Sequence, residues 1–151
     1  MVSTGIIIAS FLVGNILFNI ILRNMFPPEN TRMGFPNQSI MGMILTVWIW
    51  STLCEEILTR GLIQGFINIH KGIKFLKLSL PIWISGIFFG AMHLSLLKMM
   101  DVWFVFFIVF NATVLGLLAA YYREKTNSIY PAIFIHFWGN ILGSLPMLLL
   151  G

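Results

Sequence analysis

Long apolar runs, separated by a few short polar connections, most constrain what this chain can fold into. Several of these runs approach the roughly 20 residues that an α-helix needs to cross about 30 Å of hydrocarbon. Hydrophobic residues make up 58% of the 151 residues and charged residues only 9%, whereas a soluble domain carries about 25% charged residues. A soluble fold would leave too much apolar surface in water. The sequence therefore predicts an all-α, polytopic transmembrane helix bundle in a lipid bilayer.

The polar connections divide the chain into about five expected spans, over residues 4–22, 39–70, 80–97, 102–122 and 131–150. Ser39 can cap the second helix, and Pro81 suits the first turn of the third because its missing N–H is not needed there. The first span lacks a basic leading region and a small-residue cleavage site, so we expect a membrane anchor. We predict two units: residues 1–38, an N-terminal transmembrane helix and polar loop, and residues 39–151, a four-helix core.

The basic residues are scattered over the connections and form no tract that would grip a phosphate backbone, so no nucleic-acid partner is expected. On alternate sides of the spans they form two groups: Lys71, Lys74, Lys77, Arg123 and Lys125 against Arg23, Arg32 and Lys98. By the positive-inside rule the first group is cytoplasmic. This predicts a multi-pass protein of the cell membrane with a cytoplasmic N-terminus.

Ionisable side chains inside the spans are candidates for a functional site, because they are costly in lipid and usually face a bundle interior or a wet cavity. In the second span, Glu56 and Arg60 lie four residues apart with the acid first, which favours an ion pair. Glu55 points about 100° away from Glu56 and has no basic partner one turn along its own face. We expect Glu55 to be free to act as a general base. The alternative is that all three side chains form one helix-pairing network.

Two other spans carry histidines at similar spacings. His136 and Asn140 project from one face of the fifth span and could hydrogen-bond one group, as an oxyanion clamp does. Phe89 precedes His93 by one turn of the third span and should restrict its imidazole. Measured from the expected cytoplasmic face, which the second span passes near Arg60, Glu55 and His136 lie roughly 6–9 Å deep, but His93 lies roughly 18 Å deep if its helix begins at Pro81. Close packing of Gly86, Gly90, Gly116 and Gly143 against neighbouring helices is also expected.

The segments EEILTR, FGAMH and HFWGN, in this order and on separate spans, resemble the motifs EExxxR, FxxxH and HxxxN of the CAAX protease and bacteriocin-processing (Abi) family. The resemblance extends over about residues 45–145 and includes the stretch LGLLAAYYREKTNSIYPAIFIH. It implies an intramembrane, glutamate-dependent endopeptidase with catalytic residues Glu55, His93, His136 and Asn140. Glu55 with His93 would activate a water, and His136 with Asn140 would stabilise the oxyanion. Glu56, Arg60 and Phe89 would be supporting residues.

The resemblance also implies a substrate class, a membrane-associated or lipidated protein or peptide, and an active site near the cytoplasmic side. It implies no cofactor. Prenyl-processing relatives have more spans before the glutamate motif than the one expected here. Either this is a minimal member of the family, or a second copy of the chain closes the cavity in a homodimer.

Two alternatives use the same residues differently. Glu55, His93 and His136 could bind a catalytic zinc ion, since two histidines and a carboxylate are a known ligand set, although no HExxH pair is present. The motif residues could instead be structural in a non-catalytic protein that binds a partner, such as a bacteriocin immunity factor or other membrane regulator. Chelator sensitivity tests the first alternative, and replacement of Glu55 by Gln tests the second.

Overall fold

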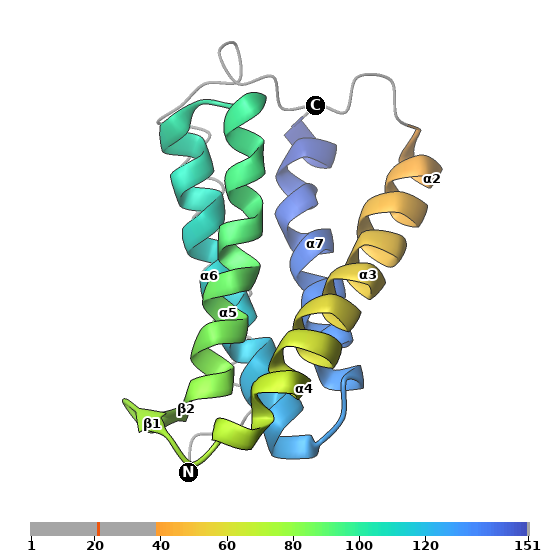
Figure 1. Cartoon of the computed structure of the whole chain (residues 1–151). Helices are drawn as coiled ribbons and strands as arrows, with labels where there is room; N and C mark the ends of the chain where they lie inside the picture. The colour runs from red at the N-terminus through yellow and green to blue at the C-terminus, as the bar shows by residue number, and fades with distance from the viewer. Residues whose placement is uncertain (1–20, 22–38, 151) are drawn as a thin grey trace.

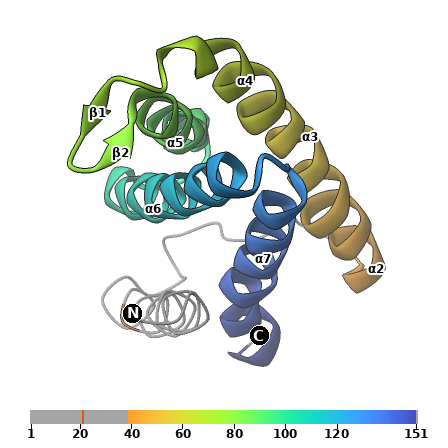
Figure 2. The same ribbon diagram turned by 90° about the horizontal axis from the view of Figure 1, so that it is seen from below.

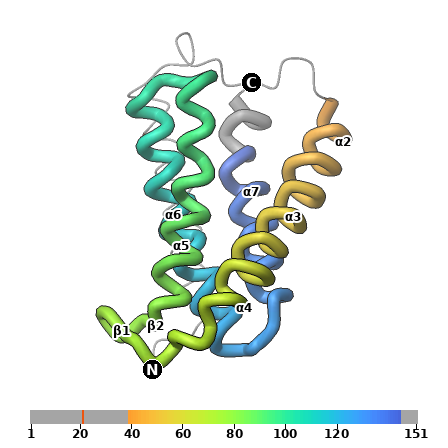
Figure 3. Tube along the Cα trace, in the orientation of Figure 1, coloured from red at the N-terminus to blue at the C-terminus, as the bar shows by residue number. Residues whose placement is uncertain are grey.

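Four rods of helix run up and down the molecule in the computed structural model, which describes residue 21 and residues 39–150, with side chains up to residue 144. Figures 1 and 3 show the first rod tilted across the other three. Within the described residues, three helices are long and apolar enough to span a membrane: Ile40–His70, Leu80–Lys98 and Val102–Thr126. The chain is thus an all-α, polytopic membrane helix protein. The expected first span and the polar loop after it lie outside the described residues.

The first rod is continuous but changes its winding along its length. It consists of α2 (Ile40–Met43), η1 (Ile44–Ser51), α3 (Thr52–Glu56), η2 (Ile57–Ile63), α4 (Gln64–Ile67) and η3 (Asn68–His70). Segments η1 and η2 have π-helical geometry and flank the glutamate pair, and π-type widening is frequent at functional sites. The side chain of Ser39 accepts a hydrogen bond from the Gly42 amide at 3.1 Å, which confirms the predicted N-cap.

The second and third rods form an antiparallel pair. Strands β1 (Lys74–Phe75) and β2 (Leu78–Ser79) precede α5 (Leu80–Met92), which has a proline in its first turn as predicted and continues as the 3₁₀-helix η4 (His93–Lys98). Helix α6 (Val102–Thr126) extends one turn beyond its expected end and is capped by Asp101, which accepts from the Trp103 amide at 2.9 Å. The fourth rod is α7 (Tyr130–Leu150).

Glycines allow α5 and α6 to approach closely, as predicted for Gly86, Gly90 and Gly116. A Cβ atom placed on Gly116 would lie 2.9 Å from the Gly86 carbonyl oxygen, and one on Gly90 would lie 1.9 Å from Thr113 Oγ1. Contacts between small residues are a common way for membrane helices to pack. For Gly143 the close contact stays a prediction, because among the described residues no atom lies within 4 Å of a Cβ built there.

Candidate active site

The glutamate motif places its two acids in different surroundings. Glu56 is 0% exposed, whereas the side chain of Glu55 is 22% exposed. Arg60 Nη1 lies 3.2 Å from Glu56 Oε1, so the ion pair expected from the i, i+4 spacing is confirmed. Because neighbouring helical residues point about 100° apart, one acid faces the interior while the other faces a more open region.

Arg60 links three of the rods. Its Nη2 donates to the Gly116 carbonyl of α6 at 2.8 Å, its Nη1 also donates to Thr59 Oγ1, and its guanidinium carbon lies 4.6 Å from the centre of the Phe89 ring in α5. One turn further, Gln64 Nε2 donates to the Ala120 carbonyl at 2.9 Å. Glu56, Arg60 and Gln64 are each 0% exposed, and we call these three residues the buried cluster. Every member except Glu56 bonds to α6.

His136 connects the buried cluster to Glu55. Its Nδ1 lies 2.9 Å from Glu56 Oε1 and its Nε2 lies 3.9 Å from Glu55 Oε2. An ionised carboxylate can only accept a hydrogen bond, so an ionised Glu56 requires the proton of His136 to be on Nδ1. His136 Nε2 then faces Glu55. The sequence paired Glu56 with Arg60 but gave no sign that the same oxygen would also contact a histidine 80 positions away.

His93 has a comparable arrangement on α5 and η4. Its Nδ1 lies 3.0 Å from the Phe89 carbonyl oxygen, which can only accept, so Nδ1 carries the proton. The Phe89 ring makes edge contacts with both imidazoles, at centroid distances of 5.3 Å to His93 and 5.0 Å to His136. Phe89 therefore packs against His93, as expected from the spacing, and also against His136.

A cavity of about 270 Å³ brings together three of the four predicted catalytic side chains. His93, His136 and Asn140 line it, together with apolar residues that come mainly from α6, among them Phe104, Phe107 and Leu115. Glu55 is not among the lining residues, but its Oε2 lies 3.9 Å from Nε2 of His136, which is. We call Glu55, His93 and Asn140 the cavity cluster.

The depths inferred from the sequence did not coincide because the first rod does not end at Arg60. It continues to His70, so Glu55 lies about 22 Å from its lower end, and His93 lies about 20 Å from the start of α5 at Leu80.

Asn140 and His136 make different hydrogen bonds in the structure, although they share one face of α7. Asn140 Nδ2 donates to Thr52 Oγ1 at 2.9 Å and, at 3.3 Å, to the Val47 carbonyl. These bonds hold α7 against the first rod. To donate to a substrate oxygen, the amide would have to release the longer of them.

Sequence reasoning missed two neighbours of the candidate residues. Ser51 Oγ donates to Glu55 Oε1, and Thr52 is the partner of Asn140 just described. Ser51 lies one turn before Glu55, so the i, i+4 spacing could have identified it. Thr52 could not have been found in this way, because its partner is on another helix.

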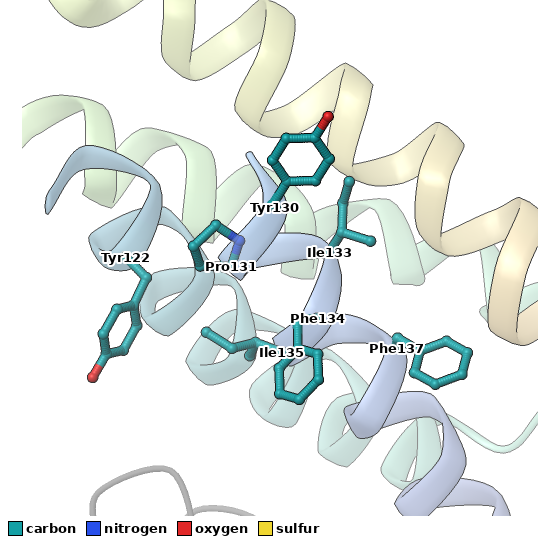
Figure 4. A pocket seen from close by; sticks show the side chains of 7 residues that line it. All are labelled: Tyr122, Tyr130, Pro131, Ile133, Phe134, Ile135 and Phe137. Atoms are coloured by element: carbon teal, nitrogen blue, oxygen red, sulfur yellow. The ribbon is translucent and has the colours of Figure 1, made fainter. Parts of the chain in front are cut away.

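A larger, apolar hollow lies elsewhere. About 690 Å³ in volume, it lies along the first turns of α7 beside Tyr122 of α6, where Figure 4 shows its aromatic and aliphatic lining. It contains no acid or histidine. Of these two cavities, only the smaller one is lined by histidines. Within the described residues, no three His, Cys, Asp or Glu side chains are grouped so that they could hold a metal ion, and Glu55, His93 and His136 form no such group.

A membrane helix bundle with two histidines and an asparagine around one cavity, and with paired glutamates next to one of the histidines, has the side chains of an intramembrane hydrolase. The family model described as type II CAAX prenyl endopeptidase, Rce1-like, matches residues 37–142, and the chain belongs to this family of peptidases. Membership implies an intramembrane protease function at the level of the family. No curated protein and no solved structure matches the chain.

Proposed function

We propose that this protein is an intramembrane endopeptidase that hydrolyses a peptide bond in a membrane-associated or lipidated protein or peptide, using a water activated by Glu55. The observation that carries the proposal is the approach of Glu55 Oε2 to His136 Nε2, 3.9 Å, beside a cavity lined by His93, His136 and Asn140. Family membership supports the reaction class.

In the first step the Glu55 carboxylate takes a proton from a water molecule. The water oxygen attacks the carbonyl carbon of the peptide, and the carbonyl oxygen becomes an oxyanion. His93 orients the water, because its Nδ1 proton is held by the Phe89 carbonyl and Nε2 is then an acceptor. When the C–N bond breaks, the proton moves from Glu55 to the leaving amine. The products are a carboxylate and an amine.

His136 and Asn140 stabilise the oxyanion in this proposal. With Nδ1 held by Glu56, His136 can donate from Nε2 only as the imidazolium. In that state the positive charges of His136 and Arg60 balance the two carboxylates of Glu55 and Glu56. Asn140 adds a second donor when Nδ2 exchanges its 3.3 Å bond to Val47 for the oxyanion.

Glu56, Arg60 and Phe89 are supporting residues. Glu56 fixes the ring of His136, Arg60 holds Glu56, and Phe89 packs against both histidines and the guanidinium. A carboxylate that orients a catalytic histidine in this way controls which nitrogen carries the proton.

The proposal includes the setting of the site. Residues 1–38 add a fifth span and a polar loop to a four-helix catalytic core of residues 39–151. The end of the bundle that carries Lys71, Lys74 and Arg123 faces the cytoplasm, together with the N-terminus. Its support is the excess of basic residues at that end. A homodimer that closes the cavity is the alternative to a monomeric enzyme, and crosslinking in membranes distinguishes the two.

The test compares membrane peptides and processed proteins from cells that carry the intact chain, Glu55→Gln or Asp101→Asn. Glutamine keeps the shape of Glu55 but removes the base. Asp101→Asn makes the same chemical change at a helix cap, where asparagine is equally suitable. We expect a cleavage product with the intact chain and with Asp101→Asn, and none with Glu55→Gln.

Two results would overturn the proposal. A biological effect retained by a folded Glu55→Gln protein would favour the non-catalytic regulatory protein. Loss of cleavage after treatment with a zinc chelator, restored by added zinc, would favour the zinc-dependent peptidase. A glutamate mechanism without a metal predicts the same rate before and after chelation.

A further inference from the structure

A short β-hairpin lies at the lower end of the bundle, between η3 and α5. Strand β1 pairs antiparallel with β2, with Lys74 opposite Ser79 and Phe75 opposite Leu78. The two turn residues, Leu76 and Lys77, have left-handed φ angles of 48° and 67°, a conformation that is costly for residues other than glycine. We call residues 71–79 the basic hairpin. Figures 1 and 2 show it projecting beyond the start of α5.

Contacts with two helices hold the basic hairpin in place. Trp83 Nε1 of α5 donates to the Phe75 carbonyl at 2.9 Å, and the Phe75 and Trp83 rings lie 5.7 Å apart. The Leu80 amide donates to the Ile73 carbonyl at 2.8 Å, and Ser79 Oγ donates to Glu124 at the end of α6. An isolated two-stranded hairpin is marginal in water, so these contacts fix a shape that the local sequence would not keep alone.

The basic hairpin presents lysines and large apolar side chains together. Lys71, Lys74 and Lys77 are exposed, and between them Ile73 is 56%, Phe75 65% and Leu76 72% exposed. Arg123 and Lys125 of α6 lie at the same end. Among the described residues of this end the acidic side chain is Glu124, and Ser79 already bonds to it.

Exposed lysines beside exposed apolar side chains are suited to the interfacial region of a bilayer, where hydrocarbon meets water. Lysine side chains bury their stems and keep their charges at the surface, and aromatic residues gather at the headgroup level. Each lysine close to an anionic membrane strengthens association roughly fivefold. We propose that the basic hairpin is a binding site for anionic phospholipid headgroups, with Ile73, Phe75 and Leu76 in the interfacial layer and the three lysines on the phosphates. This proposal requires the membrane bundle but not the peptidase mechanism.

The test places a fluorescent label at position 76 of the full chain, using Leu76→Cys in a Cys54→Ala background. The protein is reconstituted in nanodiscs of phosphatidylcholine, with or without phosphatidylserine, and quenched by nitroxide-labelled lipid. We expect stronger quenching with phosphatidylserine. Replacing Lys71, Lys74 and Lys77 by Gln should reduce the increase in quenching that phosphatidylserine causes, roughly fivefold for each lysine replaced. Molar salt should also reduce it, because the screening length falls to about 3 Å.

Three controls keep the outcome decisive. Replacing the same lysines by Arg keeps the charge and should retain the effect, which separates loss of charge from loss of fold. A label at Leu97→Cys, beside Lys98 at the other end of α5 and η4, should not respond to the hairpin variants. Inorganic phosphate should not change the signal in phosphatidylcholine discs. Equal quenching in the two lipid mixtures, or full quenching by lipid in the Gln variant, would overturn the proposal, as would a response to phosphate alone.

Discussion

The buried cluster and the cavity cluster lie side by side and contain similar polar groups, but the protein surrounds them to different extents. Glu56, Arg60 and Gln64 are 0% exposed and bond rod to rod. Glu55, with a side chain 22% exposed, is bonded by Ser51 of its own helix, and His93 by the carbonyl of Phe89 on its own rod, whereas Asn140 bonds across to the first rod.

This difference separates two uses of charge in a membrane protein. A carboxylate shared by an arginine and a histidine holds helices together, whereas the partly exposed carboxylate of Glu55 is the one that we propose to act on a water molecule. The adjacent positions of Glu55 and Glu56 on one helix produce both. If this division is right, variants of the buried cluster should change folding first, and variants of the cavity cluster should change cleavage more than folding.

The largest effect is expected for Arg60→Met. It breaks the buried ion pair of Glu56 and leaves His136 as the partner of that carboxylate, and breaking a buried pair costs about 3–5 kcal/mol. Most of the protein should fail to fold, and cleavage should be lost with it. Thermal unfolding in detergent measures the change, and Lys98→Met, an exposed cation on η4, is the matched control. An unchanged melting temperature for Arg60→Met would mean that the buried cluster does not stabilise the fold.

The next largest effect distinguishes the two glutamates. Glu55→Gln should lower the rate of product formation about 10²–10⁴-fold, the usual contribution of a general base, with little change in stability. Glu56→Gln should lower stability as well, because Arg60 then loses its buried counter-charge. Time courses of the cleavage product and melting curves are measured on both variants. If Glu55→Gln and Glu56→Gln changed the cleavage rate and the melting temperature equally, the distinction between the two glutamates would be wrong.

A smaller effect tests whether Asn140 stabilises the oxyanion or only joins helices. Asn140→Ala should slow cleavage about 10²-fold. Thr52→Val removes the partner of the 2.9 Å bond but leaves the amide, so it should cost only about 1 kcal/mol of stability and little activity. Rates and melting temperatures again separate the cases. Equal loss of activity in the two variants would mean that Asn140 acts only by joining α7 to the first rod.

Much of the fold follows from the sequence, because membrane helices are specified locally. Apolar length, the cap at Ser39 and the proline at the start of α5 predicted the helices described here. The i, i+4 rule found the Glu56–Arg60 pair. Contacts between helices were beyond this reasoning: nothing local indicates that His136 meets Glu56, or that Asn140 meets Thr52.

The basic hairpin shows the same limit in another form. Two-residue hairpin turns need left-handed backbone at both central positions and are usually signalled by Asn-Gly or Asp-Gly. Here the turn is Leu76-Lys77, and contacts with Trp83 and Glu124 impose it. The sequence therefore indicated only a lysine-rich linker.

The catalytic roles of Glu55, His93, His136 and Asn140 stay predictions until cleavage is measured.

The smallest expected effect concerns Gln64, the member of the buried cluster farthest along the first rod. Gln64→Met removes the 2.9 Å hydrogen bond to Ala120, which contributes about 0.5–1.5 kcal/mol. It also removes an amide oxygen that accepts no hydrogen bond from any described residue, and its loss offsets part of that cost. The net change should stay within about 1 kcal/mol, with normal cleavage. Gln64→Glu has nearly the same shape but buries a second acid one turn from Arg60, so it should destabilise far more. If Gln64→Met instead stopped cleavage without lowering the melting temperature, Gln64 would belong with the reactive groups. The division of these residues into a buried cluster and a cavity cluster would then be wrong.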